Sequence, residues 1–334
     1  MRFSRRLGLA LLLLVLALGQ LAAMPPGTRR EDYRRPASIP YPPENPWSAA
    51  RAALGRALFF DPRLSGSNSM ACASCPNPAL GWEDGLPTGR GDTGNRLARA
   101  TPSILDAAWA DVLMWDGRFD DLEAQALGPI TAPAEMNQPL PELVAELSAI
   151  PGYRQMFAAA FGDAAVTVPR IAQALATYER GIRSGPAPFD RWLAGNPRAM
   201  SASAQRGFTL FTGKARCARC HEGWRFTNDS FHDTGMPSPD IGRGAQVPGL
   251  RHAFKTPGLR NIARRAPYMH NGALPTLRAV LEHYNTGFVE RPSLSPEMRR
   301  LGLSPAELDD LLAFMQALTG EDAPVVLPVL PVAE

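Results

Sequence analysis

Cys217-Ala218-Arg219-Cys220-His221 is the stretch that decides the fold, and Cys72-Ala73-Ser74-Cys75-Pro76 is an incomplete copy of it. A C-x-x-C-H sequence is the attachment signature of c-type haem, in which two thiols bond to the porphyrin and the histidine ligates the iron. The first copy keeps both thiols but ends in a proline, which has no ligand atom. The sequence therefore predicts one haem c at Cys217, Cys220 and His221. A second haem at Cys72 and Cys75 stays in question.

A zinc site built from all four cysteines is the competing interpretation. Zinc ribbons separate their two cysteine pairs by roughly 15–20 residues, whereas the pairs here lie at 72–75 and 217–220. A disulfide within each pair would leave His221 without a role. Haem is therefore the better interpretation of the complete motif.

A weak internal repeat extends outward from the two motifs. Residues 54–60 (LGRALFF) precede the first cysteine pair, and residues 205–211 (QRGFTLF) precede the second. A short apolar helix that leads into C-x-x-C is how a cytochrome c domain opens. No alternating strand pattern longer than a few residues is present. We therefore expect an all-α fold of two tandem cytochrome c-like domains.

The domain limits follow from proline-rich and glycine-rich breaks. We expect a signal peptide at 1–23, a proline-rich linker at 24–46, a first domain at 47–195, a second domain at 196–322 and a tail at 323–334.

Helix ends are marked in both domains. Ser48 is the expected N-cap of the first helix, and a helix over about 168–182 followed by a packing segment to residue 192 is expected to close the first domain. Ser304, Pro305 and Glu307 form a capping-box pattern for the last helix, which Gly320 is expected to end.

The N-terminus predicts export. A basic start is followed by a leucine-rich run over 7–19 and by small residues at 22 and 23, the pattern of a secretory signal peptide. The apolar run is shorter than the roughly 20 residues that cross a bilayer, although an uncleaved anchor is the alternative. The expected location is the periplasm. A net charge of +3 does not point to nucleic acid.

The sixth iron ligand decides what the haem can do, because a sulfur or phenolate ligand closes the iron and an open position permits oxygen or peroxide chemistry. Tyr284 and Met269 are the leading candidates. The other residues downstream that carry a possible ligand atom are Met236, His232, His252, His270 and His283. For any one of these taken alone, packing is the simpler interpretation.

Several segments together resemble the bacterial di-haem cytochrome c peroxidases and the MauG-like enzymes of the same superfamily. In the second half these are residues 254–261 (FKTPGLRN) and 266–272 (APYMHNG). In the first half they are 115–118 (WDGR), 122–126 (LEAQA) and 133–137 (PAEMN). The resemblance covers roughly residues 47 to 320.

The resemblance implies roles for individual residues. Trp115 would relay electrons between two haems. Gln125 and Glu135 would lie on the distal side of the first haem, with Glu135 moving the peroxide proton. Tyr284 falls where the MauG-like branch has a tyrosine ligand and the peroxidase branch a methionine. Spacing alone does not unite Trp115, Gln125 and Glu135, because Gly128-Pro129 is expected to interrupt a helix between them.

Departures from the family pattern gather around the first haem. Pro76 replaces the proximal histidine, and residues 1–216 contain no histidine. In one account the first domain has lost its haem and Cys72 and Cys75 form a disulfide or stay free. In the other, a haem is held there by a ligand such as Met70 or by a histidine of a partner protein.

The family's calcium site between the haems is also altered. Ala100 stands where the resemblance implies an asparagine ligand, and Arg265 stands where it implies a threonine. Our hypothesis is that the Arg265 guanidinium takes the place of calcium.

Two functional interpretations remain at this stage. The first is a haem oxidoreductase that uses hydrogen peroxide to oxidise a small cytochrome, a cupredoxin or a partner protein, and the retained Trp115, Gln125 and Glu135 favour it. The alternative is a mono-haem electron-transfer protein or a non-catalytic subunit, which Pro76 favours.

Overall fold

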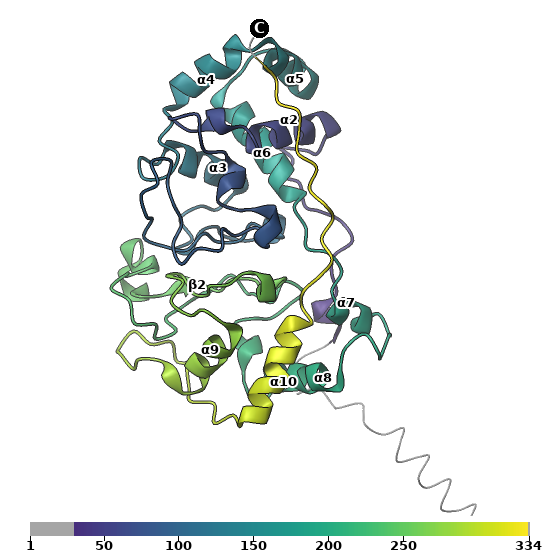
Figure 1. The fold of residues 1–334 in the computed structure, drawn as a ribbon, viewed down its shortest axis with the longest axis vertical. Coiled ribbons are helices and arrows are strands. Elements are labelled where there is room, and N and C mark those ends of the chain that lie inside the picture. The colour runs from purple at the N-terminus through teal and green to yellow at the C-terminus, as the bar shows by residue number, and fades with distance from the viewer. Residues whose placement is uncertain (1–29, 333–334) are drawn as a thin grey trace, which may run out of the picture.

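The computed structural model describes residues 30–332, so the expected signal peptide at 1–23 lies outside the described residues. The chain forms two lobes, one above the other in Figure 1. The first lobe holds helices α2 (Ala49–Phe59), α3 (Leu122–Thr131), α4 (Leu140–Ala149), α5 (Pro151–Phe161) and α6 (Val168–Arg180). The second holds α7 (Pro188–Leu193), α8 (Ala202–Thr212), α9 (Leu277–Glu282) and α10 (Pro305–Gln316), with the short antiparallel strands β1 (Phe231–His232) and β2 (Phe254–Lys255). The fold is mainly helical, and among residues 30–332 no helix is long and apolar enough to cross a membrane.

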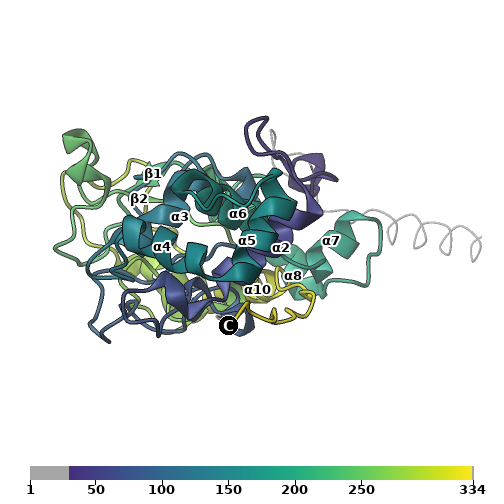
Figure 2. The same ribbon diagram turned by 90° about the horizontal axis from the view of Figure 1, so that it is seen from above.

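Both lobes are built on the same helix crossing. In the first lobe α2 packs against α6, as Figure 2 shows from above, and in the second α8 packs against α10. A glycine lies at each crossing: a Cβ on Gly55 would lie 1.9 Å from the Ala174 carbonyl oxygen, and one on Gly207 would lie 1.9 Å from that of Asp310. In the repeated segments 54–60 and 205–211, each glycine lies four residues before a phenylalanine, Phe59 or Phe211. The weak sequence repeat therefore reflects a repeated backbone contact.

This contact gives a stability prediction. Gly207→Ala should lower the free energy of unfolding by about 1–3 kcal/mol, because the added methyl must push α8 away from α10. Denaturant unfolding followed by circular dichroism measures the loss. Gly249→Ala is the matched control, since its Cβ would meet nothing within 4 Å. Equal stability of both variants would show that the helices separate without cost.

The expected helix starts are confirmed. The Ser48 hydroxyl accepts a hydrogen bond from the Arg51 amide at the start of α2. At the start of α10, Ser304 and Glu307 form the expected capping box. The end of α10 differs from expectation, because the helix stops at Gln316 and Gly320 instead donates its amide to the Asn261 side chain.

The region around Gly128-Pro129 corrects a second expectation. Helix α3 continues through Pro129 and ends at Thr131. Proline removes one backbone hydrogen bond, and so close to the helix end that loss does not stop the helix. Glu135 still lies beyond α3, in the loop that follows.

Two hydrophobic cores fill the lobes, and the second takes more of the chain than the sequence indicated. Phe189 and Trp192 of α7 were expected to pack on the first domain, but they belong to the second core with Phe208 and Phe314. Tyr33, in the expected linker, also lies in that core and is 1% exposed. The aromatic side chains of α7 thus complete the aromatic cluster of the second lobe.

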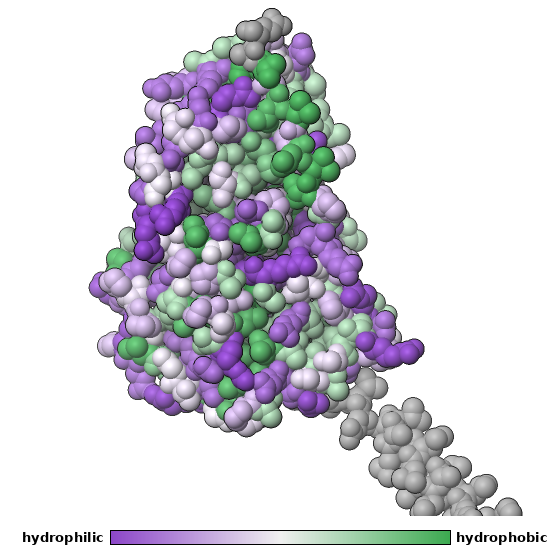
Figure 3. All heavy atoms as spheres, in the orientation of Figure 1, coloured by the Kyte–Doolittle hydropathy of each residue, from purple (hydrophilic) through white to green (hydrophobic). Residues whose placement is uncertain are grey.

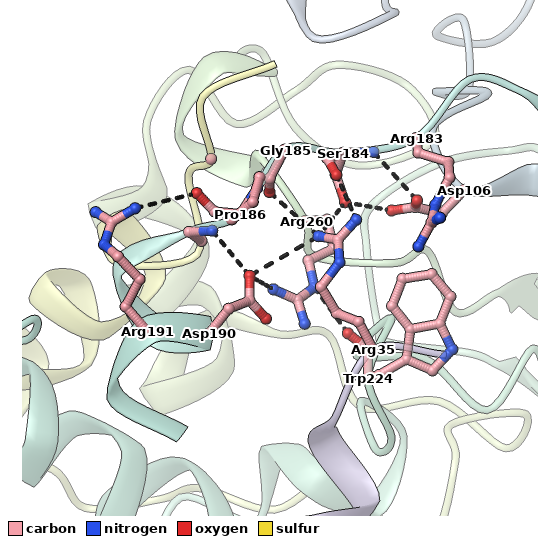
Figure 4. A network of polar contacts seen from close by, with 12 residues as sticks. Arg35, Asp106, Arg183, Ser184, Gly185, Pro186, Asp190, Arg191, Trp224 and Arg260 are labelled. Atoms are coloured by element: carbon pink, nitrogen blue, oxygen red, sulfur yellow. Dashed lines mark hydrogen bonds and ion pairs between the residues drawn. The ribbon is translucent and has the colours of Figure 1, made fainter. Parts of the chain in front are cut away.

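A polar network joins the lobes near α7 (Figure 4). The Arg260 guanidinium donates to the Asp190 carboxylate at 2.8 Å and to the Trp224 carbonyl at 2.7 Å. Arg35 donates to the Gly185 carbonyl at 3.1 Å. In the first lobe, Asp106 accepts the Ser184 amide at 3.1 Å. These bonds fix the connection between the lobes.

The C-terminal tail returns along the first lobe, as its yellow trace in Figure 1 shows. Val325 and Leu330 pack against the first core, and Arg63 donates to the Pro331 carbonyl at 2.8 Å. Other apolar tail residues remain exposed and contribute to the hydrophobic stretch on this side of the molecule in Figure 3. The tail therefore ties the second lobe back to the first.

Candidate haem site

The complete motif lies in a tight turn directly after α8. Cys217–Arg219 forms a single 3-10 turn, and the His221 amide donates to the Cys217 carbonyl at 2.9 Å. The His221 Nδ1 atom lies 2.9 Å from the Phe226 carbonyl oxygen. Because a carbonyl only accepts, Nδ1 carries the proton and Nε2 keeps its lone pair for a metal. Burial lowers the pKa of His221 to about 4, so the imidazole is neutral at pH 7.

A large cavity spans the boundary between the lobes. The second lobe contributes the motif and both leading candidates for the sixth ligand, and the first lobe contributes Trp115 and Gln125. Its wall includes Cys217, Cys220, His221, Tyr284, Met269, Trp115 and Gln125. The structure thus brings together seven of the predicted site residues, drawn from four separate parts of the sequence.

Tyr284 lies on an unusual backbone. Residues His283–Gly287 form a π-helical turn after α9, a geometry that is often found at functional sites. The pKa of Tyr284 is raised, first by burial and then by the thiols of Cys220 and Cys217, so the phenol is close to the attachment cysteines. Met269 lines the same cavity with a left-handed backbone (φ 74°).

The polar atoms of the cavity wall fit a haem. Buried side-chain nitrogens there that make no hydrogen bond in the described part of the chain include His232 Nε2, His270 Nε2, Arg216 Nε and Arg260 Nη2. Buried polar groups are normally paired, and all four belong to donor or basic groups. An acidic group in the cavity would satisfy them, and haem carries two carboxylates. Together with the two thiols and His221 Nε2, these residues fit haem c.

Trp115 connects the two lobes. Its indole Nε1 donates to the Ala100 carbonyl at 2.9 Å, and its own carbonyl accepts the Lys255 amide of β2 at 2.8 Å. The side chain therefore has a fixed place in the cavity wall between the lobes, where a relay residue would stand.

The structure does not bring Gln125 and Glu135 together in the cavity wall. Gln125 lines the cavity, and its amide lies 3.9 Å from the Met114 sulfur. Glu135 is not in the lining; its carboxylate lies 3.9 Å from Arg118, and burial raises its pKa. Glu135 lies close enough to Cys75 to act on its thiol, whose pKa is raised to about 11 by burial and then by Asp84 and Glu135.

The residues of the first motif do not fit a haem c site of the usual kind. Cys72 and Cys75 are free thiols in the structure and do not line the cavity. Cys72 begins a 3-10 turn like that of Cys217, so the backbone copy of the motif is preserved. Pro76 follows with no nitrogen to offer, and the candidate replacement Met70 packs against the first core. We assign no reaction step to an iron held by this motif.

Arg265 occupies a buried position between the lobes, 6% exposed. Its Nη2 donates to the Gly258 carbonyl at 2.6 Å, and its Nε lies 3.3 Å from the Glu83 carboxylate of the first lobe. Burial raises the pKa of Glu83 to about 7 against the opposing pull of Arg265. Arg265 stands out in the sequence, whereas Glu83, which follows the first motif, carries no recognisable signal there.

These features define the class of c-type haem oxidoreductases. The chain has a complete attachment motif, its neutral histidine lines the cavity, and both lobes are built on the same helix crossing. A family model for the di-haem cytochrome c peroxidases matches residues 49–198, and one for cytochrome c matches residues 204–319. The chain belongs to the di-haem cytochrome c peroxidase family, which includes the MauG-like enzymes.

Relatives match along nearly the whole length. The methylamine utilization protein MauG of Methylorubrum extorquens is 51% identical over 305 residues, covering 90% of this chain and 86% of the relative. Cytochrome c551 peroxidase of Nitrosomonas europaea is 34% identical, covering 86% and 85%. Among solved structures, a MauG-like protein associated with microbial copper homeostasis has a TM-score of 0.79 at 31% identity, covering 90% and 96%. The fold of two tandem cytochrome c-like domains is thereby confirmed.

Proposed function

We propose that the chain oxidises a partner protein at the expense of hydrogen peroxide, with the redox site of the second domain as its electron-exchange centre. The cavity between the lobes carries this proposal, because it unites the complete attachment motif, Tyr284 and Trp115 in one wall. The partner is a small cytochrome, a cupredoxin or a protein substrate. The expected signal peptide at residues 1–23 supports a periplasmic location.

Each residue has a defined task in this scheme. Haem c supplies the one-electron chemistry when it is bound. His221 presents Nε2 as the proximal ligand, held by the Phe226 carbonyl. Trp115 offers an oxidisable ring fixed at the domain boundary. Gln125 can donate a hydrogen bond to peroxide. Glu135, whose pKa is raised by burial, would accept and return the peroxide proton.

Tyr284 is the proposed sixth ligand, with Met269 as the alternative. A phenolate oxygen stabilises the oxidised metal more than a thioether does, so Tyr284→Met should raise the reduction potential of the second-domain haem sharply. Spectroelectrochemical titration of the exported protein measures the shift, and Met269→Leu is the matched control. An unchanged potential in Tyr284→Met would exclude the tyrosine as ligand.

Pro76 supports a second candidate function, electron transfer by a single haem. The two candidates are separated by measuring haem per chain and peroxide-driven oxidation of a reduced cytochrome on the same preparations. The pyridine haemochrome assay and the intact mass of the protein give the number of haems per chain. Peroxide-driven oxidation of the cytochrome in preparations that hold more than one haem per chain supports the peroxidase proposal. One haem per chain with no peroxide-driven oxidation would overturn it and leave the electron-transfer function.

Arg265 is the proposed replacement for an inter-domain calcium ion. Its buried guanidinium already lies against the Gly258 carbonyl and the Glu83 carboxylate, which are the kinds of oxygen that a calcium ion would bind. Metal analysis of the purified protein should therefore find no stoichiometric calcium. Calcium at one equivalent per chain would overturn this assignment.

A further inference from the structure

We propose that His270 is a positioning residue that binds a carboxylate of the second-domain haem and, through a chain of hydrogen bonds, holds Trp115 at the domain boundary. The proposal rests on the proposed relay function of Trp115. It adds the residue that sets the position of that relay relative to the cofactor.

The His270 side chain is buried and oriented, yet it lacks a polar partner. It is 4% exposed and lines the cavity. Its ring lies parallel to that of Phe254, with centroids 3.6 Å apart and 8° between the planes. Its Nε2 has no hydrogen-bond partner among residues 30–332. A buried polar atom without a hydrogen-bond partner destabilises a folded protein, so this histidine is expected to have its partner in the cavity.

The neighbouring groups identify the chemistry of that partner. Other buried atoms of the wall that make no hydrogen bond within residues 30–332, on His232, Arg216 and Arg260, are also nitrogens. Several buried basic nitrogens without a hydrogen-bond partner favour an anionic oxygen ligand. The carboxylates of a haem are such groups, and Cys217 and Cys220 would attach that haem in the same cavity.

Packing fixes the direction of the imidazole. Phe254 covers one face of the His270 ring, and the Arg99 guanidinium lies 5.5 Å from the Phe254 centroid. Arg99 is itself held by Asp240 at 2.7 Å and by Asp116 at 2.7 Å. The Phe254 ring therefore rests against an arginine that is itself held in place, and it keeps His270 in one orientation.

His270 is also coupled to Trp115. The His270 carbonyl accepts the Ala100 amide at 2.8 Å, and the Ala100 carbonyl accepts the Trp115 indole at 2.9 Å. The His270 and Trp115 rings lie 6.5 Å apart between centroids. One residue of the first lobe thus links the backbone of His270 directly to the indole. A cofactor carboxylate that fixes the imidazole would also fix the tryptophan.

The test compares two substitutions in the exported haem protein. His270→Phe keeps an aromatic ring to stack on Phe254 but removes the N–H donor, so it should lower the reduction potential of the second-domain haem by leaving the carboxylate charge uncompensated. His270→Gln restores a donor and should return the potential toward the wild-type value. His252→Gln is the control, because His252 bonds the Asp240 carbonyl and does not line the cavity.

An unchanged potential in His270→Phe would overturn the proposal. If that variant fails to retain haem, His270→Ala is measured with and without added imidazole. Recovery of the potential on adding imidazole supports carboxylate binding, and no recovery contradicts it. The reduction potential is measured without peroxide turnover. It therefore tests the role of His270 even if the protein has no peroxidase activity.

Discussion

Replacing Pro76 with histidine is expected to raise covalently bound haem from about one toward two per chain. The substitution completes the C-x-x-C-H motif at Cys72 and Cys75, whose 3-10 turn already matches that of the second motif. The imidazole supplies the proximal histidine ligand that residues 1–216 otherwise lack. Peroxide-driven oxidation of a reduced cytochrome should rise with the added haem. Intact mass and pyridine haemochrome measure the gain.

Two controls show whether the gain comes from the motif itself. Pro78→His places the same side chain two residues beyond the motif, at the start of a 3-10 turn, and should leave the haem count unchanged. Adding Cys72→Ala to Pro76→His should remove the second thioether and reduce the gain. A Pro76→His protein with the haem content of the wild type would show that the missing imidazole is not what limits the first domain.

The elements that the sequence predicts well are those fixed by neighbours along the chain. The capping residues Ser48 and Ser304 begin α2 and α10 where expected, because an N-cap bond forms within one helical turn. The haem motif is local in the same sense, since the Cys217 carbonyl and the His221 amide bond each other. Helices and the attachment turn could therefore be read before any tertiary structure was known.

The elements that the sequence does not reveal depend on contacts between distant residues. Phe189 was assigned to the first domain because it follows α6, but burial is decided by the second core. Glu83 carried no signal, because only the folded chain places it beside Arg265. The unpaired Nε2 of His270 is likewise visible only when every neighbour has been placed.

Replacing Arg265 with methionine is expected to lower the free energy of unfolding by about 3–5 kcal/mol, because it leaves the buried Glu83 carboxylate without its cation. The side chains are 5% and 16% exposed, so water cannot replace the lost interaction fully. Arg264→Met is the matched control: its guanidinium is 46% exposed and lies 3.4 Å from Asp322, a surface pair worth about 0–1 kcal/mol. Chemical denaturation of the haem protein measures both variants.

The loss of stability in Arg265→Met should grow as the pH rises. Burial raises the pKa of Glu83 to about 7 from its ordinary 4.5, and Arg265 is the group that holds it down. Removing Arg265 raises that pKa further, so the folded variant keeps a proton that the unfolded chain releases. The loss of stability is then smaller below pH 7, where Glu83 is protonated in both proteins, and it grows as the pH rises above 7. Adding Glu83→Gln to Arg265→Met should remove this pH dependence and recover most of the stability. A loss that is equal at pH 6 and pH 8 would show that Glu83 is not the partner on which Arg265 acts.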